Sequence, residues 1–175
     1  AGFRYIELTK DIKKSNTEDK KHLVDEKAVE YENAASQALK NSINKKTALN
    51  LGCYYGTAAI ELSEEFEHVI GIDFTARNIL NAQSILEEKS ITNCEFWQGD
   101  SCNLKPHFNS FDLILSTNNL EELYNIDSFV NIVEDRLNAD GIFILQSIPN
   151  RNSDKIEPLL NKKLTKIDTN IWKKV

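Results

Sequence analysis

The chain has 175 residues, of which 41% are apolar and 27% are charged, as is typical of one globular domain. Its net charge of −6 argues against a nucleic-acid partner, because binding to a polyanion depends on clustered Lys and Arg. No apolar run approaches the ~20 residues that span a bilayer, so we expect no membrane segment. The three cysteines form no CxxC pair and no signal peptide opens the chain, so we expect a cytoplasmic protein without a metal site.

Predicted elements follow one another along the chain. Residues 1–24 are charged with little periodicity, and we expect an N-terminal arm or lid before a domain spanning 25–175. Apolar periodicity predicts helices at 25–43, 57–65, 75–88, 128–137 and 154–161. Short apolar runs predict strands at 47–51, 68–73, 94–98, 111–117 and 142–148, and two more strands within 163–175. Between the helix at 128–137 and the following strand, we expect a turn in which Gly141 relieves a left-handed conformation.

This alternation predicts an α/β fold. Strands and helices in turn form βαβ units, so we expect a Rossmann-like, doubly wound, mostly parallel sheet of about seven strands with helices on both faces. Right-handed crossovers bring the carboxyl ends of the parallel strands to one edge. Ligands of such sheets bind at that edge, where the strand order reverses.

The strongest motif joins the first predicted strand to the next helix and reads Ala-Leu-Asn-Leu-Gly-Cys-Tyr-Tyr-Gly. Its glycines, Gly52 and Gly56, would let the backbone approach a ligand closely. The helix that follows offers free N–H groups and a positive dipole end. An ordinary turn between a strand and a helix would show the same pattern.

Two acidic residues support a ligand site at this edge. Asp73 ends the second strand about twenty residues further on, where its carboxylate can accept from both hydroxyls of a ribose. Asp73 could instead cap the next helix, a role for which Thr75 competes. Asp100, with Ser101, follows the third strand and can accept from the amine of an adenine. Phe74 or Cys102 could pad the ring, so the three strand ends together indicate an adenosine site.

The glycine spacing narrows the choice of cofactor. Dinucleotide sites use GxGxxG, so that backbone N–H groups meet a pyrophosphate, whereas Gly52 and Gly56 are separated by three residues that include bulky Tyr54. A phosphate-binding Walker loop would need Lys followed by Ser or Thr, and the sequence after Gly56 has neither in that pattern. The turn therefore suits an adenosine ligand without phosphates, namely S-adenosylmethionine (SAM).

The order of these motifs resembles the class I SAM-dependent methyltransferases over about residues 47–148. Two stretches, 69–77 (VIGIDFTAR) and 98–106 (QGDSCNLKP), are more specifically similar to the C-terminal methyltransferase domain of ovothiol synthases, a family of 4-mercaptohistidine N-methyltransferases. So is the strand at 111–115 that runs on to Asn118 and Tyr124.

This resemblance implies site residues and an activity. Gly52, Cys53 and Gly56 would surround the methionine part of SAM, Asp73 would hold the ribose, and Asp100 and Ser101 would bind the adenine, with Phe74 or Cys102 against its ring. Tyr54 could close over SAM or simply pack the turn. Asn118 would lie where the methyl group is transferred, with Tyr124 nearby. Asn50 stands where the family has an acid that helps to bind the SAM ammonium, and an amide makes that hydrogen bond without charge assistance. The segment after residue 148 is shorter than in the family, and no sulfoxide synthase domain is present, so such a domain is a possible partner.

The expected reaction needs little from the protein beyond alignment. A neutral imidazole nitrogen attacks with its own lone pair, so we expect proximity to dominate and neither a catalytic triad nor a metal to take part. A thiol-histidine substrate would find polar partners among residues of one stretch, namely Asn118, Asn119, Glu121, Glu122 and Tyr124. Arg77 could meet a carboxylate or pair with a surface acid. Another metabolite, a protein side chain, or a catalytically degenerate domain with a regulatory role are the alternatives; the oligomeric state is left open.

Overall fold

The computed structural model describes residues 36, 38, 40–42, 44–105, 110–117, 119–146 and 152–175. Residues 36, 38, 40 and 41 are helical, at the end of the helix expected at 25–43. The rest of that helix and the expected arm at 1–24 lie outside the described residues. None of the helices in the described part of the chain has the length and apolarity that a bilayer crossing needs.

Seven strands form one sheet in the order β3-β2-β1-β4-β5-β7-β6. Its parallel strands are β1 (Thr47–Leu51), β2 (His68–Asp73), β3 (Cys94–Gln98), β4 (Phe111–Thr117) and β5 (Leu137–Gln146). The two antiparallel strands are β6 (Thr165–Asp168) and β7 (Ile171–Lys173). The mostly parallel, doubly wound sheet predicted from the sequence is therefore confirmed, and so are the two terminal strands. Every residue of β4 is buried, as expected for a central strand covered on both faces.

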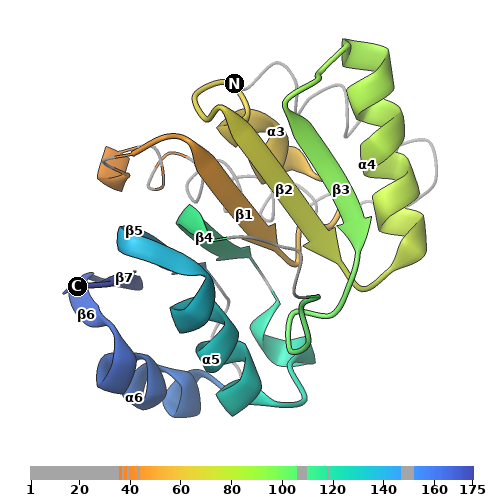
Figure 1. The fold of residues 1–175 in the computed structure, drawn as a ribbon. Helices are drawn as coiled ribbons and strands as arrows, with labels where there is room; N and C mark the ends of the chain where they lie inside the picture. Colours follow the sequence, from red (N-terminus) through yellow and green to blue (C-terminus); the bar gives the residue numbers. More distant parts are fainter. Residues whose placement is uncertain are drawn as a thin grey trace, which may run out of the picture.

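Helices cover both faces of the sheet (Figure 1). They are α3 (Thr57–Leu62), α4 (Ala76–Lys89), α5 (Ile126–Arg136) and α6 (Ser153–Lys163), with a short 3-10 turn, η1, at Leu120–Glu122. Side chains of α3 and α4 pack with one set of strand residues that includes Leu113 and Leu115. Side chains of α5 and α6 pack with the opposite set, which includes Ile114 and Phe143. The alternation along β4 and β5 thus builds two apolar layers, one on each face of the sheet.

Several element boundaries differ from the sequence predictions. Helix α3 ends at Leu62, three residues before the expected end. Helix α5 begins at Ile126 because the side chain of Asn125 accepts a hydrogen bond from the backbone N–H of Ser128. Strand β5 begins at Leu137 and includes the segment expected to be a turn.

The prediction that Gly141 adopts a left-handed conformation was wrong. Asp140, not Gly141, adopts the left-handed conformation, with φ of 64°. Gly141 is instead required by space, because a Cβ there would lie 2.8 Å from the carbonyl oxygen of Asn138. The side chain of Asp140 pairs with Lys173 on the neighbouring strand β7, 2.6 Å away.

Candidate active site

A cavity of about 380 Å³ opens at the carboxyl ends of β1–β4. The chain passes from β1 to β2 and β3 on one side, and then crosses to β4 on the other side of β1. The cavity therefore lies at the point where the strand order reverses, where open α/β sheets bind ligands. Its walls come from loops after four strands and are formed by Gly52, Asp73, Phe74, Thr75, Asp100, Ser101, Cys102, Asn119, Glu122, Leu123 and Tyr124.

The backbone of Gly52 forms the part of the wall that follows β1. Gly52 has φ of 68°, a conformation that glycine adopts without strain. A Cβ at this position would lie 2.6 Å from the Cβ of Asn119 and 3.1 Å from the carbonyl oxygen of Thr117. The turn is therefore pressed against the end of β4, and only glycine fits there.

The carboxylate of Asp73 ties the end of β2 to this turn. Its Oδ2 accepts from the backbone N–H of Tyr54 at 3.0 Å. Its Oδ1 accepts from the backbone N–H of Thr75 at 2.9 Å and from Nδ2 of Asn78 at 3.0 Å. Asp73 is half-buried and lines the cavity, and with three of its roughly four acceptor positions in use, about one is left for a ligand such as a ribose. Thr75 occupies the N-cap position of α4, but its side chain makes no capping hydrogen bond.

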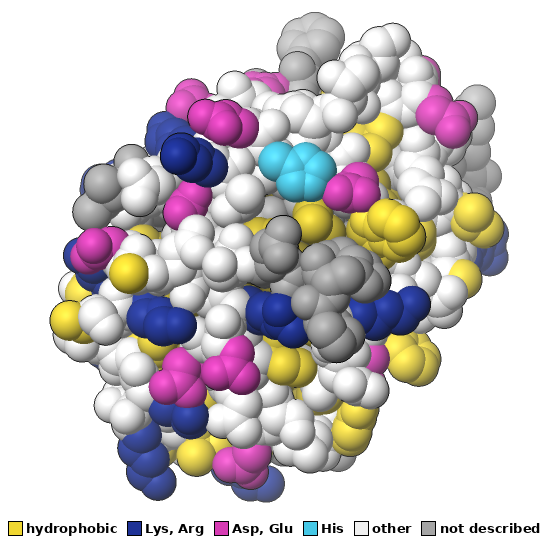
Figure 2. All heavy atoms as spheres, viewed as in Figure 1, with side chains coloured by type: hydrophobic (Ala, Val, Ile, Leu, Met, Phe, Trp, Pro, Cys, Tyr) yellow, Lys and Arg dark blue, Asp and Glu magenta, His cyan; other side chains and the backbone are white. Residues whose placement is uncertain are grey.

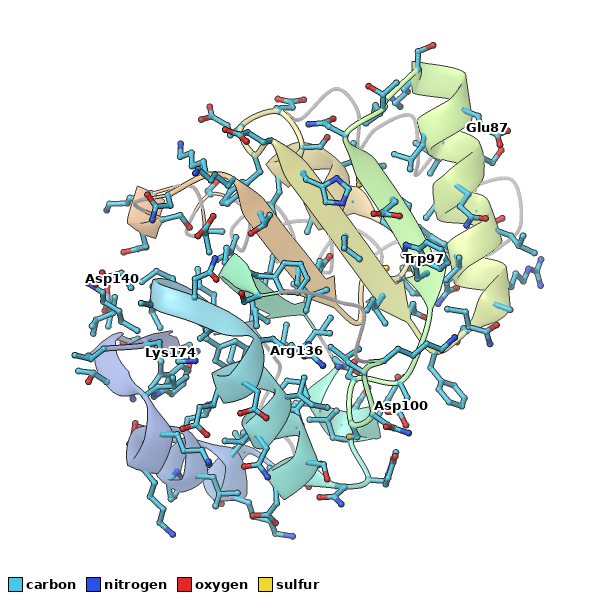
Figure 3. All side chains as sticks on the ribbon, in the orientation of Figure 1. Glu87, Trp97, Asp100, Arg136, Asp140 and Lys174 are labelled. Carbon is cyan, nitrogen blue, oxygen red and sulfur yellow. The ribbon has the colours of Figure 1, made fainter. Side chains whose placement is uncertain are left out.

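Asp100 lies on the loop after β3, at the carboxyl edge of the sheet (Figure 3). Its Oδ1 accepts from the backbone N–H of Cys102 at 2.8 Å, and its Oδ2 accepts from the hydroxyl of Tyr124 at 2.8 Å. Hydrogen bonding to the Asp100 carboxylate favours the protonated phenol and raises the pKa of Tyr124. The expected methyl-transfer residue Tyr124 thus lies beside the expected adenine partner, a proximity that its position in the sequence does not reveal.

The floor of the cavity carries a buried polar pair. Nδ2 of Asn119 donates to Oγ of Ser101 at 2.9 Å, and both side chains are only 8% exposed. Cys102 is buried beside them, and this burial raises the pKa of its thiol. Phe74 and Tyr124 are 74% and 73% exposed, although both line the cavity. Large exposed aromatic side chains at a cavity mouth are available to cover an apolar ligand surface.

Other predicted site residues lie outside the cavity lining. Asn50 is fully buried, Cys53 is 2% exposed, and burial, followed by the charge of Asp73, raises the pKa of the Cys53 thiol. Gly56 faces the ring of Phe96, which a Cβ would meet at 2.3 Å. Tyr54 lies within the turn itself and is exposed, and the centroid of its ring is 3.9 Å from that of Tyr55.

Arg77 is exposed on α4 and does not line the cavity. Asn118, expected at the methyl-transfer position, lies outside the described residues, so its role stays a prediction. Thr75 and Leu123 line the cavity without having been predicted as ligand contacts. Thr75 lies two residues after the end of β2, and Leu123 lies in the segment after β4. Neither side chain has a charge or a functional group that would have marked it as a ligand contact.

The charge of the lining restricts the ligand. Three carboxylates line the cavity, from Asp73, Asp100 and Glu122, and no Lys, Arg or His does so among the described residues. Phosphate groups would be repelled there, whereas hydroxyl, amine and cationic groups would be attracted. Within the described part of the chain, no three His, Cys, Asp or Glu side chains are grouped so that they could hold a metal. The lining therefore fits a nucleoside that carries no phosphate.

The family model described as "Methyltransferase domain" matches residues 42–174. The chain belongs to this methyltransferase-domain family. It is 30% identical to the "Uncharacterized methyltransferase YcgJ" of Bacillus subtilis over 97 residues, which are 55% of this chain and 38% of YcgJ. The chain thus spans well under half of that relative's length.

Solved structures share the fold. The N-methyltransferase NodS from Bradyrhizobium japonicum superposes with a TM-score of 0.70 at 16% identity, over 83% of this chain and 96% of NodS. The crystal structure of Bacillus YcgJ gives a TM-score of 0.62 at 24% identity, over 75% of this chain and 55% of that one. SAM-bound CalS10 from Micromonospora echinaspora, an amino pentose methyltransferase, gives 0.59 at 16% identity over 70% and 51% of the two chains. The fold is therefore the Rossmann-like fold of class I methyltransferases.

Proposed function

We propose that this domain binds SAM and transfers its methyl group to a nitrogen atom of a small molecule. One observation carries the proposal: Gly52, Asp73 and Asp100, at the ends of three neighbouring strands, line a single cavity. None of the described residues that line this cavity is Lys, Arg or His. SAM has a sulfonium and an ammonium group, two ribose hydroxyls and an adenine amine, but no phosphate. These groups match a lining that offers carboxylates and, at Gly52, a backbone that a ligand can approach closely.

Each wall of the cavity has a distinct task in this proposal. Asp73 would accept from the ribose, with its carboxylate already held by three donors on the protein side. Asp100 would accept from the adenine amine, and Phe74 would cover the ring. Bound there, SAM would supply an activated methyl group, so that catalysis consists chiefly of bringing the acceptor into line at about 3 Å.

The acceptor is proposed from the residues that resemble ovothiol synthases. The stretches at 69–77 and 98–106 favour the imidazole of a thiol-histidine over other metabolites, with the polar residues after β4 as its partners. The name of NodS, an N-methyltransferase, agrees with a nitrogen acceptor in general. On the face drawn in Figure 2, Lys and Arg are interspersed with Asp and Glu, which suits a small-molecule acceptor better than a polyanion.

Calorimetric titration of the 175-residue chain tests the cofactor. We expect heat of binding with SAM and with S-adenosylhomocysteine, and none with ATP or NAD, because the carboxylate lining repels phosphates. Flat heats and an unchanged melting temperature at millimolar SAM would refute the proposal, and so would tighter binding of ATP. A methyl-transfer assay with 5-thiohistidine and histidine, read by mass spectrometry, tests the acceptor. If neither gains a methyl group while SAM binds, another metabolite or a protein side chain becomes the acceptor to seek.

A further inference from the structure

A chain of buried and partly buried hydrogen bonds lies directly behind the turn that lines the cavity. Asn50, on β1, is fully buried, and its Nδ2 lies 3.3 Å from the carbonyl oxygen of Leu115 and 3.3 Å from Oγ1 of Thr117 on β4. Oγ1 of Thr117 lies 3.3 Å from the carbonyl oxygen of Gly52. The chain therefore leads from Asn50 through Thr117 to the residue that forms the cavity wall.

The direction of each hydrogen bond follows from the groups involved. A backbone carbonyl only accepts, so the atom of Asn50 that faces Leu115 is the amide nitrogen. For the same reason, the single proton of the Thr117 hydroxyl goes to the carbonyl of Gly52, and the hydroxyl accepts from Asn50. Both N–H groups of Asn50 are thus in use. Its Oδ1 is buried and has no hydrogen-bond partner among the described residues.

This arrangement requires an amide at position 50. A carboxylate could donate to neither Leu115 nor Thr117 and would place negative charge 3.3 Å from a carbonyl oxygen. An acid at this position therefore could not donate these two hydrogen bonds. Asn50 also does not line the cavity, so its effect on a ligand would pass through Thr117.

We propose that Asn50 is a positioning residue that fixes the carbonyl of Gly52 through Thr117, so that the cavity wall is formed before the ligand binds. Close packing also holds Gly52 in place. A Cβ at Gly52 would lie 2.6 Å from the Cβ of Asn119 and 3.1 Å from the carbonyl oxygen of Thr117. A small shift of the turn would therefore change the shape of the cavity. The inference relies on the proposed function for the identity of the ligand, SAM, but not for the state of the turn.

Substitutions at Thr117 test the middle of the chain. Thr117→Val keeps the shape but removes both hydrogen bonds, and we expect SAM affinity to fall about tenfold, the equivalent of one net hydrogen bond. Thr117→Ser keeps the hydroxyl and should restore most of the affinity. Ser116→Ala is the matched control, because Ser116 is buried on the opposite face of the same strand and its hydroxyl has no partner among the described residues. Loss of affinity in Ser116→Ala equal to that in Thr117→Val would overturn the proposal.

Substitutions at Asn50 separate positioning from direct contact. Asn50→Asp should weaken SAM binding, whereas a residue that contacted the SAM ammonium would bind it more tightly as a carboxylate. Asn50→Leu combined with Thr117→Val replaces the polar pair by apolar groups of similar shape. The free energy of unfolding of this double variant should therefore be higher than that of Thr117→Val alone, in which Asn50 has lost its partner. The double variant should bind SAM no more weakly than Thr117→Val alone, because both changes break one chain. Tighter binding by Asn50→Asp, or multiplied losses in the double variant, would refute the role.

Hydrogen exchange of the ligand-free protein gives a readout that does not depend on SAM. The backbone N–H of Cys53 donates to the carbonyl of Ile72 at 3.0 Å, and that of Gly56 donates to the carbonyl of Cys53 at 2.8 Å. Both amides should exchange several-fold faster in Thr117→Val than in the wild type or in Ser116→Ala. Unchanged exchange would refute the inference even if SAM binds. If the wild type does not bind SAM, the proposed function fails, and the exchange rates still decide the role of Asn50.

Discussion

Replacing Asp73 by Ala perturbs the proposed cofactor site most directly. Its carboxylate faces the cavity and is held from behind by Tyr54, Thr75 and Asn78 at 2.9–3.0 Å. A hydrogen bond to a charged group contributes about 1.5–3 kcal/mol, so Asp73→Ala should weaken SAM binding roughly 10- to 150-fold. Asp73→Asn keeps the shape and one acceptor oxygen, but its amide nitrogen must face one of the three donors. We expect its loss to be smaller, about tenfold.

Calorimetric titration with SAM measures both affinities, and thermal unfolding reports whether each variant still folds. Asp127→Ala is the matched control, because Asp127 is an exposed acid in the first turn of α5 and does not line the cavity. It changes the net charge equally and should leave the SAM affinity unchanged. A folded Asp73→Ala protein that binds SAM as the wild type does would show that the ribose is held elsewhere.

Three further predictions concern stability and titration. Gly56→Ala should lower the free energy of unfolding in urea by more than ~2 kcal/mol, since φ is 83° and the Cβ would lie 2.3 Å from the ring of Phe96; a smaller loss would contradict this packing. Burial raises the pKa of Cys94 from 9.0 to about 12, so the folded protein keeps a proton that the unfolded chain loses above pH 9. The free energy of unfolding should therefore fall as the pH rises from 9 towards 12, and less steeply in Cys94→Ala; equal slopes would contradict it. The hydrogen bond to Asp100 raises the pKa of the Tyr124 phenol, which should therefore titrate above 10.0. The titration of this one phenol is measured as the absorbance difference between wild type and Tyr124→Phe, and a midpoint at or below 10.0 would contradict the contact.

Much of the fold could be predicted because its strands are short apolar runs bounded by turn residues. The bounds of β1, β2, β3 and β4 agree with those expected from the sequence. Asp73 and Asp100 were also expected at strand ends, and parallel topology alone then brings both to one edge. The convergence of Gly52, Asp73 and Asp100 on one cavity thus follows from local patterns combined with one topological rule.

Contacts between distant side chains could not be predicted in this way. The hydroxyl of Tyr124 reaches Asp100 across 24 residues, and Asn50 reaches Thr117 across 67. Such contacts depend on the register of strands and the path of loops, which a period of apolar residues does not determine. The left-handed residue at the start of β5 was misassigned for a related reason, since Asp140 tolerates that conformation and the space around Gly141 is decided by the neighbouring backbone. The cap of α5 could have been found, because Asn is a favoured N-cap residue and Asn125 directly precedes the apolar Ile126.

Tyr54 shows how the turn and the site depend on each other. It has φ of 51°, a left-handed conformation that costs a non-glycine residue about 1–2 kcal/mol. The carboxylate of Asp73 accepts from the backbone N–H of this residue, and so offsets part of that cost. The same carboxylate lines the cavity, so the group proposed to bind the ribose also holds the turn that shapes the adjacent wall. The turn that follows β1 is therefore held from two sides, by Asp73 at the end of β2 and by Thr117 at the end of β4. This support allows a bulky residue, Tyr54, at a position whose backbone conformation favours glycine.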